Sequence, residues 1–71
     1  MNYLGIDLHK HESHVVVIND DGEVEHEVRV LNANLGDLAK RYTGSEAAIE
    51  ATGNYFTIYD ALDDHLAVHM S

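Results

Sequence analysis

The 71-residue sequence contains no cysteine, no proline and no tryptophan. Without cysteine, neither a disulfide nor a thiolate metal site can stabilise the fold. No apolar run approaches the roughly 18 residues of a membrane span, and the N-terminus has no signal-peptide pattern. A chain of this size buries only about 60% of the surface that it exposes when unfolded. We therefore expect residues 1–71 to form one small, marginally stable domain of a soluble, cytoplasmic protein.

Positive charge is also scarce, with four Lys and Arg against 13 Asp and Glu, for a net charge of −9. This balance argues against a basic patch that grips a phosphate backbone. Two explanations are open. One is an ordinary acidic protein that never meets nucleic acid. The other is a halophile's protein, whose hydrated acidic surface tolerates molar salt. We favour the halophile because the acids are spread along the chain and form no tail.

The first half of the chain has the pattern of three strands joined by tight turns. Residues 3–8 (YLGIDL) and 14–18 (HVVVI) are apolar, and Asp-Gly at 21–22 signals a hairpin. Residues 23–30 (EVEHEVRV) alternate strictly, which predicts a strand with one face in water, suited to the edge of a sheet. Its inner face is predicted to hold Val24, His26, Val28 and Val30, and its outer face Glu23, Glu25, Glu27 and Arg29.

The second half has helical spacing interrupted by short apolar runs. The first helix is expected after an N-cap at Asn34 and before a stop at Gly44, with an apolar stripe of Leu35, Leu38, Ala39 and Tyr42. Residues 47–51 (AAIEA) are expected to form a buried strand, and residues 66–70 (LAVHM) a last strand. Between them a second helix is expected after Asn54, with a stripe of Tyr55, Ile58, Tyr59 and Leu62.

The resulting order, β-β-β-α-β-α-β, predicts an α/β fold with a mixed five-stranded sheet and two helices. Strands joined by tight turns are antiparallel, whereas β-α-β units are parallel with right-handed crossovers. The strand order 3-2-1-4-5 meets both conditions, and it is the order of the ribonuclease H-like fold. In this order the first strand lies beside the fourth.

Two carboxylates are expected to meet at one edge of this sheet. Asp7 lies near the carboxyl end of the first strand, and Glu50 lies near that of the fourth. Parallel neighbours are about 4.8 Å apart, and open α/β sheets bind ligands at this edge. Oxygen ligands favour Mg²⁺ or Mn²⁺, ions that stabilise phosphodiester displacement. The alternative is that Asp7 only ends a strand and Glu50 is one more surface acid.

The motifs GID-x-HK at residues 5–10 and IEATG-x-Y at residues 49–55 resemble the N-terminal domain of the DEDD insertion-sequence transposases. This family includes the pilin-gene invertases and the bridge-RNA-guided recombinases, and the resemblance covers nearly the whole chain. In the family this domain is RuvC-like, and four acids bind Mg²⁺. The first Asp falls on Asp7 and the Glu on Glu50. The resemblance thus implies catalytic and metal-binding roles for both, Mg²⁺ (or Mn²⁺) as cofactor, DNA as substrate and a guide RNA as a further partner.

The chain departs from the family pattern in what it lacks. The family's third and fourth acids lie on a later segment with an Asp-x-x-Asp-like motif, and its nucleophilic serine lies in a second domain. Asp60, Asp63 and Asp64 are not assigned these roles, because they are expected on the solvent side of a helix. We expect a truncated member, part of a transposase that cleaves and joins DNA when intact but is inactive as this fragment. The alternative is a non-catalytic acidic ribonuclease H-like domain used in assembly or regulation.

Three further features of the sequence bear on function. His9, His11 and His14 could bind a transition metal, but an extended chain places His14 opposite the other two. Sugar kinases and actin-like ATPases share the core fold, yet they need a glycine soon after the strand-end Asp, where this chain has Leu8, His9 and Lys10. Finally, residues 66–70 are expected at a sheet edge, where an apolar, unpaired strand favours pairing with another copy. A homo-oligomer is therefore expected.

Overall fold

The computed structural model describes residues 2–51 and 62–70, which form a five-stranded sheet with helices on one face. The strand order is β3-β2-β1-β4-β5, antiparallel from β3 to β1 and parallel from β1 to β5. This confirms the predicted α/β class and the order 3-2-1-4-5. The elements are β1 (Tyr3–Leu8), β2 (Glu12–Ile18), β3 (Val24–Leu31), the 3₁₀-helix η1 (Asn32–Asn34), α1 (Leu35–Arg41), β4 (Glu46–Ala51) and β5 (Ala67–Met70).

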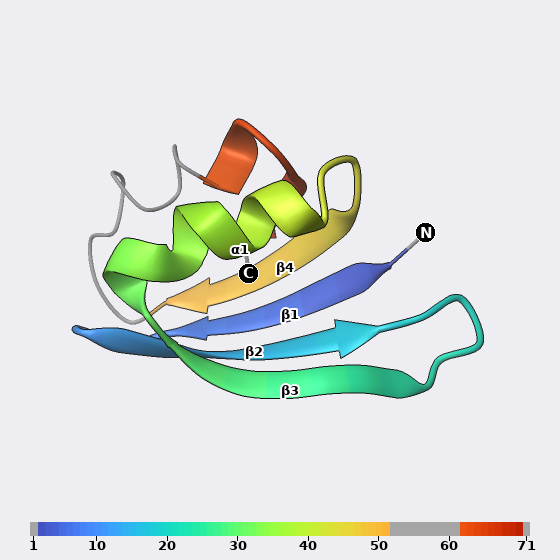
Figure 1. The fold of residues 1–71 in the computed structure, drawn as a ribbon, viewed down its shortest axis with the longest axis horizontal. Coiled ribbons are helices and arrows are strands. Elements are labelled where there is room, and N and C mark those ends of the chain that lie inside the picture. Colours follow the sequence, from blue (N-terminus) through green and yellow to red (C-terminus); the bar gives the residue numbers. More distant parts are fainter. Residues whose placement is uncertain (1, 52–61, 71) are drawn as a thin grey trace.

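The core lies between the sheet and α1, which crosses one face of the sheet (Figure 1). Alternate residues of the strands point toward α1 and are buried, as expected for a period of two. On the helix, Leu35 and Ala39 are buried and Leu38 and Tyr42 pack at the margin, as the predicted stripe requires. The buried apolar residues are Leu4, Ile6, Leu8, Val15, Val17, Leu35, Ala39, Ala47, Ile49, Leu62 and Leu66.

The other face of the sheet is covered by no described element, and we call it the bare face. The predicted second helix lies outside the described residues, except for Leu62 at its end, which is buried. Within residues 2–51 and 62–70, no helix is long and apolar enough to cross a membrane.

The turn between β2 and β3 is built around Asn19 and Gly22. The Asn19 side-chain oxygen accepts hydrogen bonds from the backbone N–H groups of Asp21 and Glu23, and the Gly22 N–H donates to the Asn19 carbonyl. Gly22 has φ +81°, a conformation that favours glycine. The predicted hairpin at Asp-Gly is therefore confirmed.

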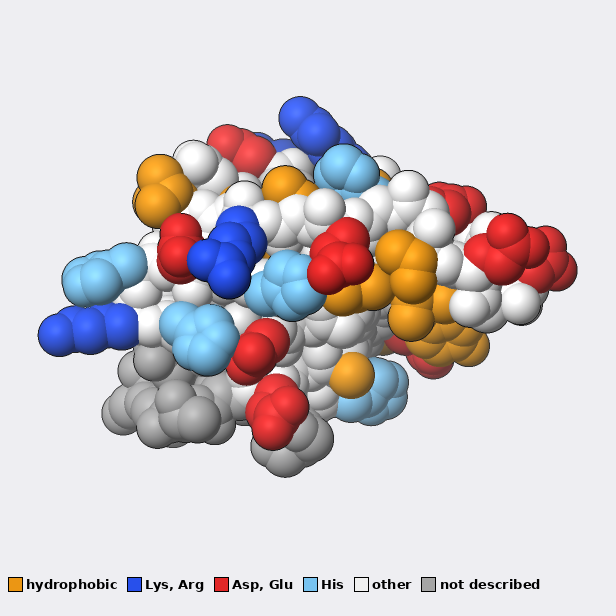
Figure 2. All heavy atoms as spheres, turned by 90° about the horizontal axis from the view of Figure 1, so that it is seen from below, with side chains coloured by type: hydrophobic (Ala, Val, Ile, Leu, Met, Phe, Trp, Pro, Cys, Tyr) orange, Lys and Arg blue, Asp and Glu red, His pale blue; other side chains and the backbone are white. Residues whose placement is uncertain are grey.

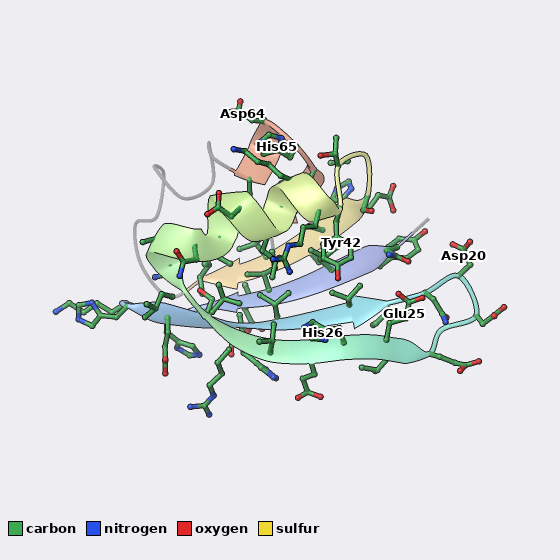
Figure 3. The ribbon with its side chains drawn as sticks, in the orientation of Figure 1. Asp20, Glu25, His26, Tyr42, Asp64 and His65 are labelled. Carbon is green, nitrogen blue, oxygen red and sulfur yellow. The ribbon has the colours of Figure 1, made fainter. Side chains whose placement is uncertain are left out.

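The strict alternation predicted for residues 23–30 is wrong at its start. A β-bulge shifts the register, so that His26 faces Val17 but Val24 faces Ile18. The extra residue, Glu25, stands on the same side of the sheet as His26 (Figure 3). Because one added residue exchanges the two faces of a strand, Val24 moves to the bare face and is 57% exposed.

Gly44 ends the helical segment and joins it to the last strand. It has φ +89°, and its N–H donates to the His65 carbonyl. The next residue, Ser45, accepts a hydrogen bond from the Ala67 N–H through its carbonyl. These contacts fix the start of β4 beside the start of β5. Asn34 is the N-cap of α1 as predicted, but its side chain makes no capping hydrogen bond.

Candidate metal centre

Asp7 and Glu50 lie side by side on the bare face. They are Cα partners in the parallel pair β1–β4, each one residue before the end of its strand. Both are exposed, whereas the preceding Ile6 and Ile49 are buried in the core. The predicted placement of the two acids at the carboxyl ends of neighbouring strands is thus confirmed. Their metal binding stays a prediction.

A hollow of about 320 Å³ adjoins the two carboxylates on the bare face. Its lining includes Gly5 and Ala48, Cα partners on β1 and β4, and Val16 on β2. A Cβ atom added at Gly5 would meet nothing within 4 Å. Packing therefore does not require glycine here, but its missing side chain leaves the middle of β1 open beside Asp7.

Two histidines contact carboxylates around this hollow. His9 Nε2 lies 3.0 Å from Asp7 Oδ2, and both side chains are at least half exposed. His14 is the Cα partner of Asp7 on β2, and its Nε2 lies 2.9 Å from Glu27 Oε1. Asp7 therefore has a carboxylate neighbour on one side and an imidazole on the other.

A second hollow, of about 570 Å³, extends from Asp7 toward β3. Along it, Arg29 Nη1 lies 3.7 Å from Glu12 Oε1. Figure 2 views the bare face and shows acidic side chains interleaved with histidines and basic side chains. The residues that line this hollow are Asp7, His9, Glu12, Ser13, His14, Glu27 and Arg29.

Asn32 fixes the turn that follows Asp7. Its side-chain Nδ2 donates to the His9 carbonyl at 2.7 Å, and its backbone N–H donates to the His11 carbonyl at 2.9 Å. Its Oδ1 accepts from the hydroxyl of Ser13, a residue that is 1% exposed. Sequence analysis missed both Asn32 and Ser13. One signal in the sequence could have found Ser13. It occupies an inward position of β2, where the other inward residues are valines.

The two carboxylates suit a hard divalent cation, but they supply only part of the ligands that such an ion needs. Asp7 and Glu50 offer carboxylate oxygens, which Mg²⁺ and Mn²⁺ prefer, and Mg²⁺ ordinarily keeps several waters. Within the described ranges 2–51 and 62–70, no group of three or more His, Asp or Glu side chains is placed to hold a metal ion. Two of the three histidines considered for a transition metal have separate partners, His9 with Asp7 and His14 with Glu27.

The acids near the C-terminal end lie away from this pair. Asp63 and Asp64 are exposed, and Asp64 stands on the side of the sheet that α1 covers (Figure 3). Asp60 lies outside the described residues. The expectation that Asp63 and Asp64 lie on the solvent side agrees with this position.

No protein-family model matches the sequence, and no curated protein matches it either. The motifs around Asp7 and Glu50, and the strands that carry them, are therefore the features that connect this chain with a family.

Proposed function

We propose that this chain is the N-terminal, RuvC-like part of a DEDD-type DNA transposase or recombinase of the ribonuclease H-like fold. Asp7 and Glu50 are its metal ligands, and Mg²⁺ or Mn²⁺ is the cofactor. The observation that carries the proposal is the in-register pairing of these two acids at the carboxyl ends of β1 and β4. Two motifs far apart in the sequence, GID-x-HK and IEATG-x-Y, thereby supply one residue each to the same point.

The residues around the pair have definable tasks. When bound, the cation supplies charge stabilisation for cleavage of a phosphodiester. Asp7 and Glu50 would hold it through their carboxylates at the ends of β1 and β4. His9 contacts Oδ2 of Asp7, which orients this carboxylate. The hydrogen bonds of Asn32 to the carbonyls of His9 and His11 hold the turn that carries His9.

The intact enzyme is proposed to bind DNA mainly through surfaces other than this acidic chain. With 13 acids and four cations, this part repels a phosphate backbone except where a divalent cation is bound. The guide RNA implied by the family resemblance belongs to the same intact protein. We expect such an enzyme to act in the cytoplasm.

The first prediction concerns metal binding by the 71-residue chain. Because Asp7 and Glu50 are two ligands of an expected four, Mn²⁺ is expected to bind weakly and to broaden NMR signals of β1 and β4 around these residues. Asp7→Asn and Glu50→Gln are each expected to remove this local broadening. Glu46→Gln is the matched control, since Glu46 is on the same strand but pairs with Tyr3 at the opposite end.

The same preparation is expected to cut no DNA. Broadening that is unchanged in Asp7→Asn would disprove the metal centre and favour the non-catalytic role in assembly or regulation. Mg²⁺-dependent nicking that is lost in Asp7→Ala would instead show that other residues of this chain complete the site.

A further inference from the structure

β3 is the longer of the two edge strands of the sheet. The strand order places β3 at one edge and β5 at the other. β3 spans eight residues and β5 four. An edge strand presents backbone N–H and C=O groups to which a further strand can pair. No described element lies beyond β3 (Figure 1), so its outer edge is open to a second chain.

β3 also carries exposed apolar side chains at both ends. Val24 and Leu31 are each 57% exposed, and with Tyr3 they are the large hydrophobic residues exposed in the described part of the chain. The bulge places Val24 on the bare face, opposite Ile18. Leu31, opposite Glu12, lies on the same face. Each end of β3 thus carries one exposed apolar side chain on the same face of the sheet.

We propose that two copies of this chain pair through β3, antiparallel, with Val28 of one copy opposite Val28 of the other on a two-fold axis. In this register Glu27 lies opposite Arg29 of the second copy, and Arg29 lies opposite its Glu27. Opposite charges that face each other across two strands stabilise the pair. The result is a continuous sheet through both copies, as the isologous contact of a two-fold dimer requires.

The charges on β3 select this register over its neighbours. A shift by two residues in one direction places Glu27 opposite Glu27, and a shift in the other direction places Arg29 opposite Arg29. Like charges directly opposite destabilise a strand pair. A shift by one residue turns the inward-facing valines to the charged side. Among these registers, only the one with Val28 opposite Val28 pairs opposite charges and keeps the inward-facing residues of both copies on the same side of the sheet.

The apolar residues of β3 agree with the same register. On the core side, Val28 meets Val28 and Val30 meets His26 of the second copy, and Val28 and Val30 already pack at the margin of the core. On the bare face, Val24 of one copy comes next to Leu31 of the other at each end. Pairing thus covers the two exposed apolar side chains of this strand.

The contacts that Glu27 and Arg29 make within one copy leave them available. Glu27 contacts His14, and Arg29 lies 3.7 Å from Glu12 with its side chain 78% exposed. β5 offers less to a partner, since Leu66 before it is buried and Val68 packs against the core. β5 does lie at a sheet edge, as predicted for residues 66–70, but the contact proposed here uses β3.

The test exchanges the two charges and measures dimerisation by analytical ultracentrifugation near 0.15 M salt, where the Debye length is about 8 Å. Glu27→Arg and Arg29→Glu each create two like-charged pairs, so each is expected to weaken the dimer about tenfold or more. The double variant Glu27→Arg/Arg29→Glu restores opposite charges and is expected to recover the dimer. Glu25→Arg changes the net charge as much as Glu27→Arg, but the bulge removes residue 25 from the pairing, so no weakening is expected.

A second measurement uses the absence of native cysteine. Directly opposed residues of antiparallel strands have Cα atoms about 4.5–5.5 Å apart, within the range of a disulfide. Val28→Cys is therefore expected to form a covalent dimer under mild oxidation. His26→Cys is the control on the same face, because residues 26 of the two copies are four positions apart along the strand, about 13 Å.

The outcomes decide the proposal. A monomer at every concentration overturns it. So does a dimer whose strength follows net charge, with Glu27→Arg strengthening it and the double variant giving no recovery. A dimer that is indifferent to these charges and is not cross-linked by Val28→Cys points to β5 or the bare face, and also overturns it.

Discussion

Asn32 connects the start of η1 to the segment from His9 to Ser13 through three hydrogen bonds. It donates to the carbonyls of His9 and His11 and accepts from the Ser13 hydroxyl. Ser13 is 1% exposed, so this last bond is shielded from water. A buried polar group that loses its partner costs more free energy than the bond itself contributes. One half-buried asparagine therefore supports the turn beside Asp7.

Replacing Asn32 tests this role. Asn32→Ala removes the side-chain bonds and leaves the Ser13 hydroxyl without this partner, so the free energy of unfolding is expected to fall by about 1–3 kcal/mol. Urea denaturation measures the change. Asn34→Ala is the control, because the Asn34 side chain makes no capping hydrogen bond, and a change within about 0.5 kcal/mol is expected. Equal losses in both variants would contradict the assigned role of Asn32.

Sequence reasoning located Asp7 and Glu50 but not Asn32, for a physical reason. The two acids follow apolar runs whose strand character is local, and the crossover rules then place those strands side by side. Asn32 acts through partners 19 and 23 residues away, and the residues next to it in the sequence do not indicate these partners. Whether the two acids bind metal depends on the remaining ligands, which residue patterns within 71 positions do not supply.

At the scale of elements, β2 and β3 show where periodicity succeeds and fails. β2 begins at Glu12, two residues before its predicted start, because Ser13 pairs with Leu8 and continues the ladder. The polar residues Glu12 and Ser13 at the start of β2 gave no apolar strand pattern, so the prediction did not include them. In β3 the alternation of valine and acid is real in the sequence, but the bulge at Glu25 exchanges the faces near the start of the strand. A bulge is set by pairing with the neighbouring strand, so alternation within one strand cannot reveal it.

The junction between α1 and β4 supplies the prediction at this scale. Gly44 has φ +89°, and an L-residue in such a left-handed conformation costs roughly 1–2 kcal/mol. Gly44→Ala is therefore expected to lower the free energy of unfolding by about that amount. Gly36→Ala is the matched control inside α1, where a Cβ would meet nothing within 4 Å. Alanine's better helix propensity is expected to stabilise this variant by about 0.5–1 kcal/mol.

Opposite signs in the two alanine variants, measured by urea denaturation, are the required result. A neutral or stabilising Gly44→Ala would mean that the junction adopts another conformation in solution. It would also remove the argument that the bond from the Gly44 N–H to the His65 carbonyl fixes the start of β4.

The stability of the whole molecule depends on two opposing contributions, the burial of the apolar core and the repulsion between its acidic side chains. One helix covers one face of the sheet in the described part, and the formal net charge is −9. So small a core leaves little margin, while like charges oppose the compact state. The pairing proposed through β3 adds apolar burial, yet it brings two anionic copies together. Ionic strength therefore acts on folding and on association in the same direction.

The last prediction is that salt stabilises the fold. The Debye length falls from about 10 Å at 0.1 M to about 3 Å at 1 M, so repulsion among the exposed acids is screened. The urea midpoint is expected to rise steadily as KCl increases toward about 2 M. A variant with Asp21→Asn, Glu23→Gln and Glu25→Gln removes three exposed acids around the hairpin. It is expected to be more stable in dilute buffer and to gain less from salt.

Both proteins are measured at a concentration where light scattering shows one species, so that association does not enter. The variant separates screening from a general effect of salt on apolar burial, which would raise both midpoints alike. Equal stability in dilute buffer and molar KCl would contradict both the repulsion argument and the halophilic interpretation of the acidic surface.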